Sequence, residues 1–461
     1  MAIDRATLAG VECLDTLART SADDPQVEWT LLAYDAPLSE LCLEPGCLPL
    51  VPDSPSARPL PGPARARLGR LSGGEVSPWA ETSTAALPGF VAGARVTRCP
   101  RPPSPCEEIR SGSVHTCALL VDGSVWCWGD NGFGQLGDGT TTSRVNPTRV
   151  GLDDVSQLEL GDFTTCAVSR GTVFCWGRND SGQLGRPGPS SPWPTPVHDV
   201  DFRAALAVGK GHACAAANIP GTEAKKVMCW GRNESGELGT GNTDPQTGPV
   251  ETASITGVRK LAVGGQRSCA IVGSENRVRC WGGNEGQALF PTGEEIILVP
   301  RTVEGLSAIA ELAMGQDAQC ARTLDGQIQC WGINNRNQVG DGSGRDTSAP
   351  VPLLELAVTS DLDGGGYGFC AVRNFVPQCW GRYFGPRPTQ VDGFPSDGVV
   401  EVSPGAGLIT GTTGSEEVHV LPHVCARTPD GQVFCWGGNA AGQLGDGTIS
   451  EERKTPAPVL W

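Results

Sequence analysis

The chain has 461 residues and a formal net charge of −16, and it contains 63 glycines, 37 prolines and 19 cysteines. This composition predicts many short elements joined by tight turns, arranged as one large domain plus a smaller one. The negative charge argues against a nucleic-acid partner, whose phosphates require Lys and Arg, and no apolar run is long enough to span a membrane as a helix.

Residues 1–106 are expected to form a small β module or an extension that precedes the repeats. Strands are predicted at 27–34 and 93–97, with a proline-rich stretch between them at 51–63. No export signal, with a basic start and an apolar run, is recognisable after Met1. The segment holds five cysteines, of which two pairs are close enough to bond locally and one is left over: Cys42/Cys47, Cys99/Cys106 and Cys13.

The tripeptide Cys-Trp-Gly recurs through residues 107–461, and its copies are 48, 54, 51, 50, 49 and 56 residues apart. A period near fifty is typical of solenoids and propellers, in which one unit cannot bury its own apolar face. An open solenoid needs capping units, but here the last copy is as regular as the first. The copies therefore favour a closed ring, and they begin at Cys127, Cys175, Cys229, Cys280, Cys330, Cys379 and Cys435.

Each repeat contains the strands of one propeller blade. A second cysteine precedes each Cys-Trp-Gly, and a turn between the two predicts a β-hairpin, as for 115–121 with 124–128. A further strand precedes the hairpin, such as Val155–Leu160, and an extended segment follows it, such as 146–150. The chain is therefore predicted to be all-β, a seven-bladed β-propeller with one repeat of about fifty residues per blade.

Glycines recur at fixed places in the repeats. In six repeats a glycine stands five residues before the first cysteine, where we expect a turn that needs positive φ: Gly112, Gly161, Gly209, Gly264, Gly315 and Gly365. A second set is expected to be left-handed, with Asn337 replacing glycine in the fifth repeat: Gly134, Gly182, Gly236 and Gly442. The Leu or Val two residues further on is expected to be buried.

The run at 129–140, Gly-Asp-Asn-Gly-Phe-Gly-Gln-Leu-Gly-Asp-Gly-Thr, resembles the signature of the regulator-of-chromosome-condensation repeat. The run His-Thr-Cys-Ala-Leu at 115–119 and the Cys-Trp-Gly after it resemble the same family. The resemblance covers residues 107–461 and is to a bacterial-type extracellular variant with Cys-Trp-Gly repeats. It implies a seven-bladed propeller with one repeat per blade.

The cysteine pairs are predicted to face each other across the hairpins. A two-residue loop sets Cys166 opposite Cys175, and a three-residue loop sets Cys117 opposite Cys127. Opposed residues lie about 4.5–5.5 Å apart at Cα, which suits a disulfide. Reduced thiols and metal ligands are the alternatives, and disulfides are favoured because the positions are paired in every repeat: Cys117, Cys127, Cys166, Cys175, Cys214, Cys229, Cys269, Cys280, Cys320, Cys330, Cys370, Cys379, Cys425 and Cys435.

Neither a metal site nor an active site is expected. His115, His212 and His423 lie two residues before a cysteine in only three repeats, so they are interpreted as repeat residues rather than zinc ligands. No Ser/His/Asp order, phosphate-binding Gly-rich motif or carboxylate pair stands out from the repeats. We therefore expect no enzyme activity, no cofactor and no metal.

The sixth repeat lacks the signature loop and has Arg382, Tyr383 and Phe384 in its place. Aromatic residues and Arg are enriched at binding hot spots, so these three are candidate partner-binding residues, and neutral loss of the loop is the alternative. Two long segments, 218–226 and 386–398, are further candidate surfaces.

These observations favour a monomeric, non-catalytic protein-binding scaffold that presents loops on its two faces. Disulfides place it outside the cell or in the cell envelope, secreted or surface-displayed, with the cytoplasm as the alternative. The resemblance also implies a second function, guanine-nucleotide exchange on the small GTPase Ran. That function is tied to a reducing compartment, against which the cysteine pairs argue, and to a basic N-terminal tail, which this sequence does not show.

Overall fold

The computed structural model describes residues 104–200, 202–218, 225–410 and 418–461, together with five short strands nearer the N-terminus. The chain divides into two compact units, Met1–Arg101 and Pro102–Trp461. In the first unit β3 pairs with β1 and β4, and β2 pairs with β5. The strands are β1 (Leu31–Leu32), β2 (Leu41–Leu43), β3 (Arg65–Ser72), β4 (Glu75–Ser83) and β5 (Val96–Arg98). The predicted Cys42–Cys47 bond and Cys13 lie outside the described residues.

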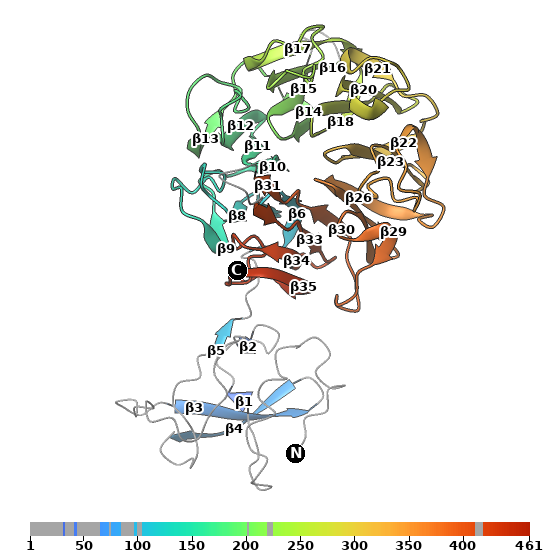
Figure 1. Ribbon diagram of the computed structural model, residues 1–461. Coiled ribbons are helices and arrows are strands. Elements are labelled where there is room, and N and C mark those ends of the chain that lie inside the picture. The colour runs from blue at the N-terminus through green and yellow to red at the C-terminus, as the bar shows by residue number, and fades with distance from the viewer. Residues whose placement is uncertain are drawn as a thin grey trace. The chain divides into compact units, whose positions relative to one another are not determined.

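The second unit is a ring of seven antiparallel four-stranded sheets, here called blades 1 to 7 in chain order (Figure 1). The strands of blades 1 to 3 are β6 (Cys106–Ser111), β7 (His115–Leu120), β8 (Val125–Gly129) and β9 (Arg144–Arg149); β10 (Val155–Leu160), β11 (Thr164–Ser169), β12 (Thr172–Gly177) and β13 (Ser191–Pro196); and β14 (Phe202–Val208), β15 (His212–Asn218), β16 (Lys225–Gly231) and β17 (Gln246–Thr256). The all-β, seven-bladed propeller predicted from the repeats is confirmed.

Blades 4 to 6 follow the same order, and the first strand of each blade lines the central channel. Their strands are β18 (Val258–Gly264), β19 (Arg267–Val272), β20 (Arg277–Gly283) and β21 (Ile296–Thr302); β22 (Ile309–Met314), β23 (Ala318–Thr323), β24 (Ile328–Gly332) and β25 (Thr347–Pro352); and β26 (Thr359–Gly365), β27 (Gly368–Arg373), β28 (Val376–Gly381) and β29 (Gly385–Gln390). A 3-10 turn, η6 (Glu285–Gln287), follows β20.

Blade 7 carries an insertion between its first two strands. It consists of β30 (Glu401–Pro404), β33 (His423–Arg427), β34 (Val433–Asn439) and β35 (Ser450–Pro458), and β31 (Leu408–Thr410) and β32 (Val418–Val420) form a separate hairpin. The view in Figure 1 draws β31 over the middle of the ring. The N–H of Gly407, just before this hairpin, donates to the carbonyl of Ser113 in blade 1 at 3.1 Å.

All seven cysteine pairs of the hairpins lie at disulfide distance, with S–S separations of 2.08–2.13 Å. Each pair is in direct cross-strand register, as the loop lengths predicted for Cys166 with Cys175. All fourteen residues are fully buried. The predicted Cys99–Cys106 bond is wrong, because Cys106 is a free thiol that begins β6 and turns into the core beside Ile109.

The tryptophan of the Cys-Trp-Gly repeat joins neighbouring blades. The indole N–H of Trp176 in blade 2 donates to the carbonyl of Gln135 in blade 1 at 2.9 Å. The same bond recurs at four further boundaries, from Trp128, Trp230, Trp281 and Trp380. Among the described residues Trp331 has no such partner, and the corresponding carbonyl, of Ala288, accepts from the Gln319 side chain.

Replacing Trp176 by Phe is therefore expected to destabilise the ring more than replacing Trp331 by Phe. Both changes remove similar apolar surface, but only the first breaks a bond and leaves a buried carbonyl with one donor fewer, which costs about 1–2 kcal/mol. Urea unfolding of the two variants measures the difference. Equal losses of stability would show that the indole bond contributes nothing to the joint between blades.

The glycines five residues before the first cysteine do not adopt positive φ, so that prediction is wrong. At most of them the backbone of the next blade leaves no room for a Cβ. A Cβ on Gly161 would come within 2.1 Å of the Gly209 carbonyl oxygen, and one on Gly365 within 2.0 Å of that of Pro404. Gly209 is the exception, because the nearest atom to a Cβ there is a Val263 side-chain carbon at 3.3 Å. In blade 7 the equivalent contact comes from Gly405, where a Cβ would lie 2.4 Å from the Gly112 carbonyl oxygen.

The second set of glycines behaves as predicted. Gly134, Gly182, Gly236 and Gly442 have φ between 76° and 81°, and Asn337 has φ 64°. The predicted burial of the loop leucines is also confirmed, with Leu136 at 0% exposure.

Candidate functional site

In most blades the loop between the third and fourth strands is held by its own hydrogen bonds and packs against the next blade. This loop is here called the plug, and in blade 1 it comprises residues 130–143. In blade 1 the Asn131 amide donates to the carbonyls of Thr140 and Thr142, both at 3.1 Å, while its oxygen accepts from the N–H of Leu136. This holds Leu136 buried against the next blade, where Gly137 touches the indole of Trp176. The equivalent apolar side chains are all buried, at Leu184, Leu238, Leu289, Val339 and Leu444.

Blade 6 lacks this plug. The pair Gly381 and Gly385 closes its loop, so that only residues 382–384 lie between the strands. In blade 5 the corresponding pair, Gly332 and Thr347, encloses residues 333–346. No loop leucine therefore reaches Trp436 of blade 7, and the described aromatic side chains that pack against Trp436 are Phe384 and Phe394.

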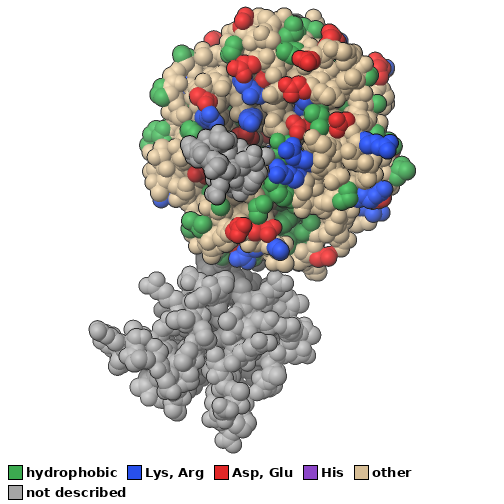
Figure 2. Space-filling view, in the orientation of Figure 1, with side chains coloured by type: hydrophobic (Ala, Val, Ile, Leu, Met, Phe, Trp, Pro, Cys, Tyr) green, Lys and Arg blue, Asp and Glu red, His purple; other side chains and the backbone are tan. Residues whose placement is uncertain are grey.

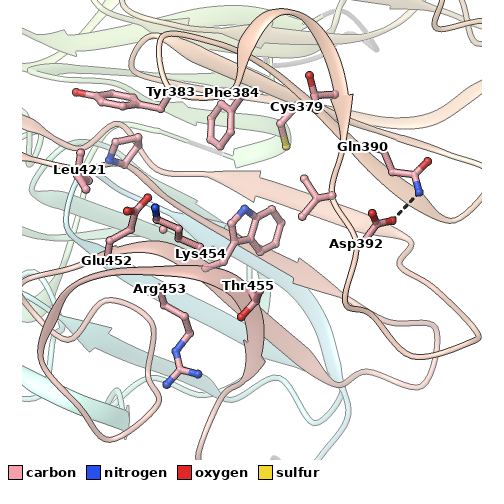
Figure 3. A pocket seen from close by; sticks show the side chains of 15 residues that line it. Cys379, Tyr383, Phe384, Gln390, Asp392, Leu421, Glu452, Arg453, Lys454 and Thr455 are labelled. Atoms are coloured by element: carbon pink, nitrogen blue, oxygen red, sulfur yellow. Dashed lines mark hydrogen bonds between the residues drawn. The ribbon is translucent and has the colours of Figure 1, made fainter.

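A groove of about 430 Å³ lies where the plug is missing, between blades 6 and 7 (Figure 3). Tyr383 and Phe384 line one side, and Leu421 and Glu452 lie across from them. Its wall includes Trp436, Pro422 and part of β35 with the exposed Lys454. An apolar floor with a polar rim at this size suits a ligand side chain or short segment.

Arginine and tyrosine side chains stack next to Tyr383, which lines this groove. The guanidinium carbon of Arg336 lies 4.3 Å from the ring centre of Tyr367, and that of Arg382 lies 5.7 Å from Tyr367 and 5.1 Å from Tyr383. They meet because turns after first strands and loops after third strands emerge at the same end of each blade. Such cation–π contacts orient the guanidinium groups while leaving their N–H groups free to donate.

Arg382 is the least neutralised of these cations. Within the described residues it has no ion pair, and its buried Nη1 has no hydrogen-bond partner. Arg336 has one distant carboxylate, Asp317 at 3.8 Å. Acidic and basic side chains are interspersed on the face shown in Figure 2, with basic ones near the middle of the ring.

Of the three predicted residues, Tyr383 and Phe384 line the groove, and Arg382 stacks on Tyr383. The loop 218–226 falls mostly outside the described residues. The segment 386–398 is partly structural, because Phe394 packs on Trp436 and Arg387 pairs with Glu355 at 2.6 Å. The groove itself could not be predicted from the sequence, since it depends on what the neighbouring blade lacks.

The central channel is lined by carboxylates that are tied to one another across blades. Arg110 in blade 1 pairs with Glu108 beside it, and with Glu401 in blade 7 at 2.7 Å. Burial raises the pKa of Glu159 to about 8 and, with the charges of Glu401 and Glu311, that of Asp361 to about 8. Among the described residues no cluster of three or more His, Cys, Asp or Glu is arranged to hold a metal ion. The ion pairs of the channel therefore hold neighbouring blades together.

The three repeat histidines also join blades. The hydroxyl of Thr165 in blade 2 donates to the Gln135 carbonyl at 2.8 Å, so it must accept from Nε2–H of His115 in blade 1, 3.0 Å away. His212 and His423 make the same bond to a hydroxyl of the next blade. Their Nδ1 atoms have no partner among the described residues, and burial lowers each pKa to about 3.

Acid is expected to weaken the ring through these histidines. In the unfolded chain they take up protons below pH about 6.5, whereas in the folded chain they stay neutral, so each costs about 2 kcal/mol at pH 5. The channel carboxylates with raised pKa act in the opposite direction, so one histidine must be isolated. His212→Gln keeps an N–H that can reach Ser268 and cannot be protonated.

Unfolding in urea at pH 7 and pH 5 tests this. The free energy of unfolding of the wild type should fall by about 2 kcal/mol more than that of His212→Gln. Parallel changes in the two proteins would mean that His212 is already charged in the folded state.

Two family models for the regulator of chromosome condensation (RCC1) repeat match the chain. One covers residues 107–135 and 155–183, and the other covers 122–168, 170–216, 226–271 and 430–460. The ultraviolet-B receptor UVR8 of Arabidopsis thaliana is 30% identical over 389 residues, which are 77% of this chain and 82% of that receptor. The human E3 ubiquitin-protein ligase HERC2 is 28% identical over 71% of this chain, but these residues are only 7% of the ligase.

Solved structures share the fold at lower identity. Human WBSCR16 is 21% identical with a TM-score of 0.59, over 68% of this chain and 90% of that one. Yeast RCC1 (Prp20), solved with Kap60 bound, is 20% identical with a TM-score of 0.56, over 64% and 77% of the two chains. No helix in the described part of the chain is long and apolar enough to cross a membrane.

Proposed function

The chain belongs to the regulator of chromosome condensation (RCC1) repeat family, and from this premise we propose that it is a non-catalytic scaffold that binds a protein partner at blade 6. The single observation that carries the proposal is the missing plug. Every other blade buries a Leu or Val at this place, and blade 6 instead presents a groove lined by Tyr383 and Phe384, with Arg382 stacked on Tyr383.

The chemistry of the groove supports a protein ligand. Tyr and Arg dominate binding hot spots because they combine large contact area with directional donors, and both stand here beside an apolar pocket. The wider family is consistent with it, since the yeast RCC1 structure has Kap60 bound, and Prp20p was solved in a study of its binding to Gsp1p and histones. A monomeric state stays a prediction.

The compartment follows from the cysteines. Fourteen paired, buried cysteines suit an oxidising environment, so we place the protein outside the cell or in the cell envelope. Protein isolated from the producing cells, unfolded without reductant and alkylated, should gain at most five labels by intact mass. Labelling of most of its 19 cysteines would contradict both the disulfides and the oxidising compartment.

Transferring the plug from blade 5 to blade 6 tests the binding function. Residues 333–346 replace residues 382–384, because the flanking strand pairs Gly332/Thr347 and Gly381/Gly385 are equivalent. Proximity labelling in the producing cells is then compared between the wild type and this graft. We expect the graft to fold and to lose at least one strongly labelled partner.

The matched control exchanges the plug of blade 2 for that of blade 5, which changes the sequence but leaves a plug in place. It should keep every partner. Identical partner sets for the wild type and the blade-6 graft would overturn the assignment of this site.

A further inference from the structure

We infer that the blade-6 site recognises an acidic segment of its protein partner that also carries a leucine-like side chain. This inference rests on the proposed function and adds the chemistry of the partner. It joins two observations: the arginines that stack on Tyr367 and, for Arg382, on Tyr383 at the groove, and the groove that lies where other blades have a plug Leu or Val.

The arginines select for carboxylates. The Tyr367 ring lies within cation–π distance of both Arg336 and Arg382, which fixes the two guanidinium groups on one aromatic platform. Arg382 has no carboxylate in contact and an unpartnered buried Nη1 among the described residues. A fixed guanidinium with free N–H groups binds a carboxylate in bidentate fashion, and little side-chain entropy remains to be lost.

The groove selects for an aliphatic side chain. In six blades a Leu or Val from the plug is buried against the tryptophan of the next blade, as Leu136 is against Trp176. At blade 6 the corresponding tryptophan, Trp436, is packed by Phe384 and Phe394 instead of a Leu or Val, and it forms part of the groove wall. A partner leucine would lie in the groove against this aromatic wall.

Proteins fit this site better than nucleic acids do, although both carry anions. The chain has a net charge of −16, which repels an extended phosphate backbone. A short segment with two or three carboxylates needs only the local arginines.

Fluorescence anisotropy with labelled peptides tests the inference on the full chain. The probe is fluorescein-Gly-Glu-Glu-Leu-Glu-Glu-Gly, compared with versions that carry Lys for Glu or Gly for Leu, and with a single-stranded thymidine oligonucleotide. We expect saturable binding of the Glu/Leu peptide, at least fivefold weaker binding without Leu, and none with Lys. The Arg336→Ala/Arg382→Ala variant should bind at least tenfold more weakly.

Arg178→Ala is the matched control. Arg178 also lies over aromatic rings, 5.2 Å from Phe133 and 5.7 Å from Phe163, but it is paired with Asp180. Its loss should change binding less than twofold. Equal binding by the double arginine variant, or tighter binding of the oligonucleotide than of the peptide, would overturn the inference.

The two proposals fail separately. If the peptides do not bind while the blade-6 graft still loses a labelled partner, only the acidic, leucine-bearing partner is wrong. If the graft keeps all its partners, the site itself is wrong.

Discussion

A chain whose disulfides have been reduced and alkylated is expected not to hold the propeller at 37 °C. The seven bonds close loops with sequence separations of 9 to 15 residues, and each is worth about 2–3 kcal/mol through the unfolded chain. Their sum, about 14–21 kcal/mol, is at or above the upper end of the ~5–15 kcal/mol by which folded proteins are ordinarily stable. Circular dichroism and thermal unfolding of the alkylated chain should therefore show no cooperative transition.

The native protein should nevertheless resist reductant. All fourteen cysteines have 0% exposure, so a thiolate cannot reach a sulfur atom until a blade opens. Dithiothreitol alone should leave the bonds intact for hours, and dithiothreitol with urea should break all seven. A fully reduced chain that unfolds cooperatively at the wild-type temperature would show that the hairpin pairs do not stabilise the ring.

Gly161→Ala is expected to be among the most damaging additions of a single methyl group in the propeller core. The added Cβ would lie 2.1 Å from the Gly209 carbonyl oxygen of the next blade, and 3.1 Å from Val208. Because the obstacle is backbone and the ring is closed, relief requires two blades to separate along their whole inner strands. We expect a loss of about 3 kcal/mol or more in the free energy of unfolding, at the upper end of overpacking effects.

Gly151→Ala is its control, since a Cβ there meets nothing within 4 Å and Gly151 has no positive φ. It should change the free energy of unfolding by less than ~0.5 kcal/mol. Urea unfolding of both variants measures the contrast. Equal effects would mean that the inner glycines tolerate a side chain and that the blades are less tightly apposed than the structure has them.

The sequence predicts the blades well because each blade is built from local contacts. Loop length alone sets the register of a hairpin, so the pairing of Cys166 with Cys175 follows from the residues between them. The left-handed positions, such as Gly134 and Asn337, are predictable for the same reason, since φ is a property of the turn.

What joins one blade to the next could not be predicted in this way. Gly161 has to be glycine because a Cβ there would clash with the carbonyl oxygen of Gly209, some fifty residues away. Its turn-like appearance in the sequence is therefore misleading. His115 looks like a possible zinc ligand until Thr165 of the next blade is seen beside it. Cys106 is a free thiol, because β6 directs it into the propeller core beside Ile109.

The candidate site combines features that the sequence shows with contacts that only the fold creates. The loss of the plug and the unusual Arg382, Tyr383 and Phe384 are visible in the sequence as a broken repeat. Their neighbours come from elsewhere in the chain: Tyr367, on which Arg382 stacks, lies in another turn, and Trp436, which lines the groove, lies in another blade, so only the fold brings them close.

Photocrosslinking at single positions tests the central claim, that blade 6 is the partner site, most directly. Benzoylphenylalanine is placed at Tyr383 or, as the control, at Phe133 in the plug of blade 1, two aromatic positions with similar exposure of 42% and 37%. Irradiation of the producing cells should yield a discrete adduct from position 383 and none from position 133. An adduct at 133 with none at 383 would contradict the assignment of the binding site to blade 6.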